Sequence, residues 1–223
     1  MTNQTQPVLE RRYRIFALAL LLSLALCFVL TGCLSRPAMV RQNFALQTPA
    51  ATNTAAAKSE RVLAVRSCEV SPLFAGRSFV YRTGPDTYEV DHYAGFLVPP
   101  DRAIVLPVRA RLRNAGAFKD VVEPGSQLRA NTFLEIHVGE FYGDFRKPGD
   151  FAAVLTLRLI FYDAATSSAG KIFLQKDYSR RVPVKENLAA AVVAGWNQGL
   201  AEIMAEVASD LENAWNTKSG PTI

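Results

Sequence analysis

The clearest hydrophobic periodicity lies near the C-terminus of the chain. From residue 188 to residue 215, apolar residues recur every three or four positions and form one helical stripe. Glu202, Glu206 and Asp210 lie off this stripe. The pattern predicts a long amphipathic helix that packs on a sheet, with Gly195 and Gly199 permitting close approach of the two backbones.

The middle of the chain alternates between apolar and polar positions with a period of two, which is typical of β-strands. Leu155, Leu157, Leu159 and Phe161 share one face of a predicted strand over residues 154–162. The same alternation predicts strands over 128–138 and 171–181. Long strands joined by short polar loops favour an antiparallel meander.

The first half of the mature chain predicts shorter strands. Residues 40–46 and 61–70 each fit one strand, and residues 77–82 and 87–90 fit a hairpin. The turn of this hairpin is predicted over residues 83–86, because Gly84 and Pro85 are residues that tight turns favour.

A second helix is predicted over residues 104–115. Ile104, Val108 and Leu112 follow helical spacing, and Gly116 is a suitable stop. Pro107 cannot donate a helix hydrogen bond, so we expect a kink there. Residues 108–113 also alternate, and a strand over them stays open as an alternative. Together these elements predict an α/β (α+β) fold: a single mixed, largely antiparallel sheet packed against two main helices.

The N-terminus has the layout of a secretory signal peptide. Arg11, Arg12 and Arg14 precede an apolar run over residues 15–30, which is shorter than the roughly 20 residues that a membrane-spanning helix needs. The run ends in Leu30-Thr31-Gly32-Cys33, the pattern of a bacterial lipoprotein signal.

This pattern predicts cleavage by signal peptidase II between Gly32 and Cys33, and acylation of Cys33 with lipid such as palmitate. Two or more acyl chains anchor a protein stably in a membrane. The residue after the cysteine is Leu34 rather than aspartate, which favours the outer membrane. A retained signal anchor and a plain secretory signal stay open as alternatives.

The domain boundaries follow from these segments. We expect a cleaved signal peptide over 1–32, a lipid-anchored tether over 33–40, one folded domain over 41–216 and a disordered tail over 217–223. Residues 48–59 are poor in large apolar side chains and predict a flexible loop within the domain.

Charge and cysteine content narrow the function. The formal net charge of +5 falls to +3 without the leader, which holds three arginines and Glu10, and no basic block indicates nucleic-acid binding. Cys68 is the only cysteine left besides Cys33 and Cys27 of the leader, so we expect an inert, buried thiol.

No constellation of residues predicts catalysis. His92 and His137 lack further ligands at metal-binding spacing, and we interpret both as structural. Glu140, Asp144 and Asp150 are three carboxylates close in sequence, but their spacing alone does not support a catalytic carboxylate pair. We therefore expect no bound metal, no cofactor and no enzymatic activity.

Aromatic residues gather where the strand over 128–138 gives way to a turn. Phe141, Tyr142 and Phe145 precede the turn residues Pro148 and Gly149. These three side chains predict a cap on the core, with a lip that contacts lipid or a partner protein as the alternative.

Six segments of the sequence carry a resemblance to a known family: Leu30–Cys33, Phe44–Leu46, Arg61–Val65, Phe79–Arg82, Tyr88–Phe96 and Ala117–Val122. Through them the chain resembles the auxiliary lipoproteins of MCE-type ABC transport systems, the paraquat-inducible protein C-like family. A tryptophan typical of the family after His92 is absent here, where Tyr93 and Phe96 stand instead.

The resemblance implies a lipid anchor in the inner leaflet of the outer membrane. The domain that it carries would face the periplasm and dock an MCE protein. The partners of that MCE protein would be an ABC permease and an ATPase, and the cargo phospholipid or another hydrophobic molecule. Direct contact with lipid and a homo-oligomeric state stay open. Two rival functions are an envelope-assembly lipoprotein, such as a plug for the lipopolysaccharide translocon, and a lipid-anchored envelope hydrolase.

Overall fold

The computed structural model describes residues 11, 12, 14, 16–23, 40–50, 59–164 and 170–218, with side chains of the last helix up to Trp215. The chain divides into two compact units, Met1–Val40 and Arg41–Ile223. In the first unit, residues 16–23 are helical. Among the described residues, no helix is both long enough and apolar enough to cross a membrane.

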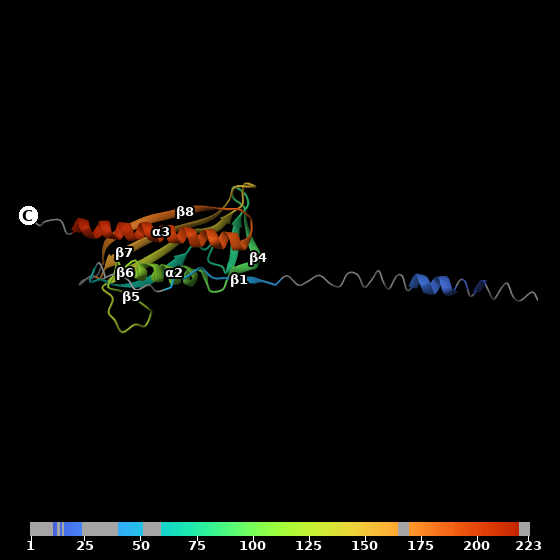
Figure 1. The fold of residues 1–223 in the computed structure, drawn as a ribbon, viewed down its shortest axis with the longest axis horizontal. Helices are drawn as coiled ribbons and strands as arrows, with labels where there is room; N and C mark the ends of the chain where they lie inside the picture. The colour runs from blue at the N-terminus through green and yellow to red at the C-terminus, as the bar shows by residue number, and fades with distance from the viewer. Residues whose placement is uncertain are drawn as a thin grey trace, which may run out of the picture. The chain divides into compact units, whose positions relative to one another are not determined.

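In the described part of the second unit, eight strands form one mixed sheet, with β6 at its centre (Figure 1). On one side β6 pairs with β7. On its other side it pairs first with β2 and then, at its end, with β3. The strands are β1 (Gln42–Phe44), β2 (Val62–Val70), β3 (Ser78–Arg82), β4 (Tyr88–Phe96), β5 (Asp120–Val122), β6 (Thr132–Asp144), β7 (Phe151–Asp163) and β8 (Lys171–Val184).

The three long strands confirm the predicted meander. β6 pairs antiparallel with β7, and β7 pairs antiparallel with β8. Leu155, Leu157, Leu159 and Phe161 are each at most 1% exposed, as the period-two pattern predicts. Pro183 lies in β8, which among the described strands pairs with β7 alone. An edge strand tolerates proline because its outer N–H groups have no strand to bond.

The remaining pairs make the sheet mixed. β1 pairs parallel with β4, while β2 pairs parallel with both β5 and β6. β3 and β4 form the predicted antiparallel hairpin, closed by a hydrogen bond from the Thr83 amide to the Thr87 carbonyl. Parallel pairing brings together segments far apart in sequence, since it requires a crossover connection.

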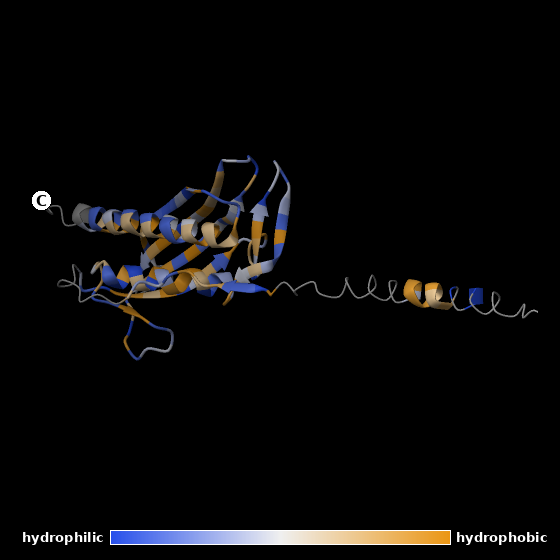
Figure 2. Ribbon diagram, turned by 45° about the vertical axis from the view of Figure 1, so that its right-hand side comes forward, coloured by the Kyte–Doolittle hydropathy of each residue, from blue (hydrophilic) through white to orange (hydrophobic). Residues whose placement is uncertain are grey.

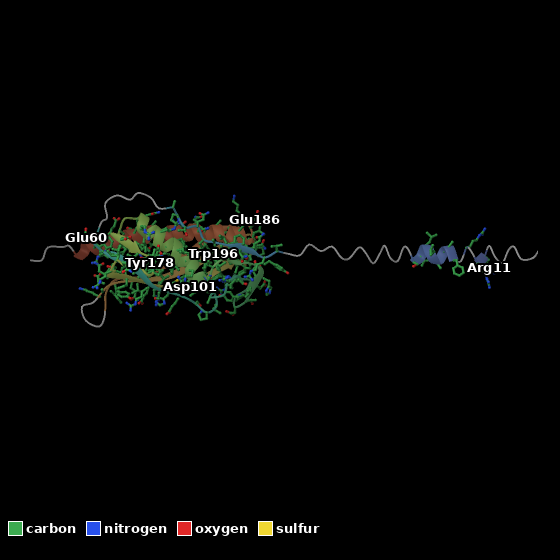
Figure 3. The ribbon with its side chains drawn as sticks, turned by 90° about the horizontal axis from the view of Figure 1, so that it is seen from below. Arg11, Glu60, Asp101, Tyr178, Glu186 and Trp196 are labelled. Atoms are coloured by element: carbon green, nitrogen blue, oxygen red, sulfur yellow. The ribbon has the colours of Figure 1, made fainter. Side chains whose placement is uncertain are left out.

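Two helices lie on one face of this sheet (Figures 1 and 3). Helix α2 (Pro100–Asn114) contacts β2 and β5, and helix α3 (Ala189–Lys218) contacts β7 and β8. α2 runs through Pro107, so the alternative strand over 108–113 was wrong. Proline at the first helical position and Asp101 in the first turn suit a helix start. Gly116 takes φ 63°, a left-handed conformation that often ends a helix.

The core lies between α3 and the sheet. Trp196 is 1% exposed, and its indole N–H donates to the Val154 carbonyl at 3.1 Å. Tyr178 of β8 is equally buried, and Figure 3 labels both side chains within the body of the domain. Figure 2 shows apolar and polar residues alternating along α3 and the strands, as the sequence predicts.

Several element boundaries differ from the predictions. β1 covers only Gln42–Phe44 of the expected 40–46, and β4 continues to Phe96. The strand expected over 128–138 begins instead at Thr132 and runs to Asp144, with Leu128 57% exposed. Gly125, at φ 83°, lies in a turn after β5, and residues 123–131 form no strand. Most of the expected tether and of the loop over 48–59 lies outside the described residues.

Candidate functional site

The residues predicted for lipid attachment lie outside the described part of the chain. Neither Gly32 nor Cys33 is described, so their cleavage and acylation stay predictions. Cys68 is a free cysteine of intermediate burial on β2. Burial and the nearby carboxylates of Asp101 and Glu69 raise the pKa of its thiol to about 12. A thiol with this pKa stays protonated at neutral pH and is a poor nucleophile.

Of the three aromatic residues near the end of β6, Phe141 and Tyr142 are buried in the core, and Phe145 is partly buried against it. Phe141 is 2% exposed and packs on Trp196, with ring centroids 4.5 Å apart. Tyr142 is 3% exposed and faces the other side of the sheet, where it stacks on Phe74 at 5.6 Å. Phe145 stacks on Tyr81 at 4.7 Å. The burial of Phe141 and Tyr142 fits a cap on the core, and contact of these three residues with lipid or a partner protein stays a prediction.

The two histidines lie on different strands. His92 is exposed on β4, and His137 on β6 places its Nδ1 3.4 Å from a Glu69 carboxylate oxygen on β2. Within the described ranges, no three His, Cys, Asp or Glu side chains could together hold a metal ion.

A cleft of about 550 Å³ lies where several strands and turns meet at one end of the sheet. We call it the sheet-end cleft. β3 ends at Arg82 and β6 ends at Asp144, and these two residues are paired in the parallel register. The β3–β4 turn, the β6–β7 turn and β8 complete the lining. Its charged residues are Arg82, Asp144, Arg146, Lys147, Asp150 and Arg181.

Asp144 organises one wall of this cleft. Its side chain is 3% exposed, and Arg146 donates to both of its oxygens, from Nε at 2.8 Å and from Nη2 at 2.7 Å. These hydrogen bonds lower the pKa of the Asp144 carboxyl to about 2, against the opposing effect of burial. Asp144 is therefore an ionised, buried carboxylate at any physiological pH.

Arg181 links this wall to the next turn. Its Nη1 lies 3.2 Å from a carboxylate oxygen of Asp150, and its Nε lies 3.6 Å from Asp144. Of the three carboxylates considered from sequence, Asp144 and Asp150 thus share an arginine. Glu140 lies apart and accepts a hydrogen bond from Thr156 at 2.7 Å.

Positive charge is in excess around the sheet-end cleft. Its lining contains four cations, Arg82, Arg146, Lys147 and Arg181, and two carboxylates, Asp144 and Asp150, which leaves a formal charge of +2. The sequence by itself does not indicate that these four cations form a group. The only signals for them were basic residues beside predicted turns, and no periodicity reveals that these turns converge.

A second group of charges lies between α3 and β8. Lys176 contacts Glu206 and Asp210, both at 2.8 Å, and Arg180 contacts Glu206 at 2.6 Å and Glu202 at 3.3 Å. We call these five residues the α3–β8 ion-pair row. Hydrogen bonds from Lys176 and Arg180 lower the pKa of Glu206. The three carboxylates predicted to lie off the apolar stripe of α3 therefore face cations on β8.

A shallower cleft of about 410 Å³ lies on the sheet face opposite the helices. His137, Arg158 and Asp177 lie side by side across β6, β7 and β8 there. Arg158 Nε donates to Asp177 at 2.7 Å, so each of these two charges has a partner. This cleft has no surplus of charge comparable to that of the sheet-end cleft.

Comparisons with known proteins give a family and a fold. The family model described as "ABC-type transport auxiliary lipoprotein component" matches residues 44–208. A search of curated proteins found no match.

Many solved structures match this chain, and two of them serve to describe the shared fold. A protein from Xanthomonas campestris is 19% identical, with a TM-score of 0.66, over 81% of this chain and 100% of that one. An uncharacterized protein is 17% identical, with a TM-score of 0.61, over 77% of this chain and 99% of that one. At these identities the likeness concerns the fold alone.

Proposed function

The chain belongs to the family of ABC-type transport auxiliary lipoprotein components, and from this premise we propose that it is the lipid-anchored, periplasm-facing partner of an MCE-type system. The observation that carries the proposal is the extent of the family match. Residues 44–208 include every strand from β2 to β8, all of α2 and most of α3. The family is one of auxiliary transport components rather than of enzymes, so the protein acts by association with an ABC transport system.

In this proposal the anchor is the acylated Cys33, and the membrane is the outer membrane, with the domain facing the periplasm. Val40 lies seven positions after Cys33, a reach of at most about 25 Å at ~3.5 Å per residue. The domain that begins at Arg41 therefore stays close to the membrane surface.

Metabolic labelling with palmitate tests the anchor. We expect label on the wild-type protein and on Cys68→Ala, because Cys68 lies within the folded sheet. Cys33→Ala should carry none. Label that persists on Cys33→Ala would show that Cys33 is not the acylated residue.

The role proposed for the domain is docking. It holds an MCE protein at the outer membrane, so that phospholipid or another hydrophobic cargo can cross the periplasm. ATP hydrolysis belongs to the ATPase of the system. Contact between this domain and the lipid itself is not required by this role.

Co-purification tests the docking role. The tagged full-length protein is extracted from membranes with a mild detergent, and the proteins bound to it are identified by mass spectrometry. Recovery of an MCE protein with its permease and ATPase supports the proposal. Recovery of the lipopolysaccharide translocon instead would overturn it in favour of an envelope-assembly role. Cys33→Ala, which lacks the proposed anchor, is the control. It shows whether a protein is recovered only because it lies in the same membrane as the tagged protein.

A further inference from the structure

The sheet-end cleft has a charge that its own residues do not balance. Its formal charge of +2 comes from four cations and two carboxylates. Asp144 and Asp150 are already occupied by Arg146 and Arg181. The uncompensated charge is therefore associated with the other two cations, Arg82 and Lys147.

The contacts of these two cations leave donors unused. Lys147 is exposed and makes no ion pair with any described residue. The Nε of Arg82 is buried, and among the described residues it has no hydrogen-bond partner. Arg109 and Arg111 have a buried Nε of the same kind away from the cleft, so it is the unpaired charges of Lys147 and Arg82, rather than this nitrogen, that favour a ligand.

The size of the cleft also favours a ligand. β3 and β6 are parallel neighbours, and the cleft lies beyond their carboxyl ends. A volume of about 550 Å³ lies within the range of small-molecule sites.

We propose that the sheet-end cleft binds a phosphate-type anion. Arginine and lysine recognise phosphate by charge-assisted hydrogen bonds, and a phosphate monoester carries between about one and a half and two negative charges at neutral pH. The surplus of the lining therefore balances inorganic phosphate or a phosphate monoester, whereas the phosphodiester of a phospholipid headgroup carries one negative charge and balances half of it. The volume exceeds the needs of the phosphate group itself and leaves room for the remainder of a headgroup.

The phosphate group has two possible sources, a phospholipid headgroup and free phosphate. Lys147 and Arg82 contact the anion, while Asp144 holds Arg146 and Arg181 in place around it. This site does not depend on the docking role, because the two rest on different observations.

Titration of the full-length protein in a neutral detergent tests the site. One arm uses inorganic phosphate and the other dihexanoyl-phosphatidylglycerol, each followed by calorimetry and by ³¹P line broadening. Binding in both arms shows recognition of the phosphate group itself, and binding in one arm alone identifies the source. Binding in neither arm overturns the proposal.

Variants locate the binding. Lys147→Gln should raise the Kd about tenfold, which corresponds to the loss of one charge-assisted contact. Arg82→Lys, which keeps the charge but loses the planar fork, should weaken binding less. Arg158→Gln is the matched control, since Arg158 is an exposed arginine outside the cleft. An equal effect of Arg158→Gln and Lys147→Gln would show non-specific electrostatics and overturn the proposal.

Lys147→Gln also removes the risk that loss of binding reflects unfolding. Its side chain is exposed and lies in the β6–β7 turn, so the melting temperature should not change. Absence of binding in the wild-type protein would leave the docking role untouched, because co-purification with an MCE protein does not require an anion.

Discussion

The α3–β8 ion-pair row and the sheet-end cleft consist of the same kinds of side chain, basic residues and carboxylates, but they differ in how these charges are paired. In the row, two cations face three carboxylates, and Lys176 and Arg180 each contact two of them. In the cleft, Arg146 and Arg181 hold the two carboxylates, while Arg82 and Lys147 line the same volume without a carboxylate partner among the described residues. Charges that are paired between two packed elements fix the position of a helix. Unpaired charges of one sign around a cleft attract a ligand of the other sign.

The largest expected effect comes from removing the buried carboxylate of the cleft. Asp144→Ala removes the carboxylate that Arg146 and Arg181 share, and we expect the free energy of unfolding to fall by about 2 kcal/mol, because the hydrogen bonds are lost while both arginines stay partly exposed to water. Urea denaturation measures the change. Asp177→Ala is the control, because its pair with Arg158 is exposed. A similar loss in both variants would contradict the structural importance of Asp144.

The same carboxylate predicts a dependence of stability on pH. The pKa of Asp144 is about 2 in the folded protein, below its ordinary value of 3.8. The unfolded state therefore binds the proton more readily, and the stabilisation is complete above about pH 4. It is lost as the pH falls from about 4 to about 2, by up to about 2 kcal/mol. Asp144→Asn should flatten the unfolding free energy in this window, and an unchanged pH profile would contradict the assignment.

The next largest loss of stability is expected where α3 packs closely on the sheet. A Cβ at Gly195 would lie 2.6 Å from the Ala153 Cβ, so Gly195→Ala must displace the helix. We expect a loss of about 1–2 kcal/mol.

Gly199→Ala is the matched control for this substitution. Its Cβ would lie 3.3 Å from atoms of Arg180 and Val182, and alanine favours the helix more than glycine does. Its unfolding free energy should stay near that of the wild type. Phosphate binding should survive both substitutions, since neither glycine lines the cleft.

The smallest effect is expected in the ion-pair row. Glu206→Gln removes the carboxylate that Lys176 and Arg180 share, but these side chains are 28–41% exposed. Solvent screens such pairs, which are usually worth less than about 1 kcal/mol. A loss of unfolding free energy as large as that of Asp144→Ala would remove the distinction between the two regions.

Periodicity predicted those elements that bury one face. Leu155–Phe161 and the stripe of α3 pack as expected, because alternation and helical spacing report directly which side faces the core. The end of β6 was missed because both of its faces are covered. Phe141 packs on α3, while Tyr142 packs on Phe74. A strand buried on both sides has no alternation to detect.

The sheet-end cleft could not be predicted for a different reason. Arg82, Asp144 and Arg181 come from three strands, and their proximity follows from the pairing of those strands. A period of two shows which face a residue occupies but not which strand lies beside it. The parallel pairing of β3 with β6 is therefore the step that sequence reasoning lacked.

Charge reversal at Lys147 tests most directly whether surplus charge makes the cleft a binding site. Lys147→Glu lowers the formal charge of the lining from +2 to zero without touching the buried Asp144. Lys171→Glu makes the same change at an exposed residue at the start of β8, outside the cleft. Calorimetric titration with inorganic phosphate should show a Kd raised at least about tenfold for Lys147→Glu and little changed for Lys171→Glu. Equal Kd values for the two variants would contradict a phosphate site in the sheet-end cleft.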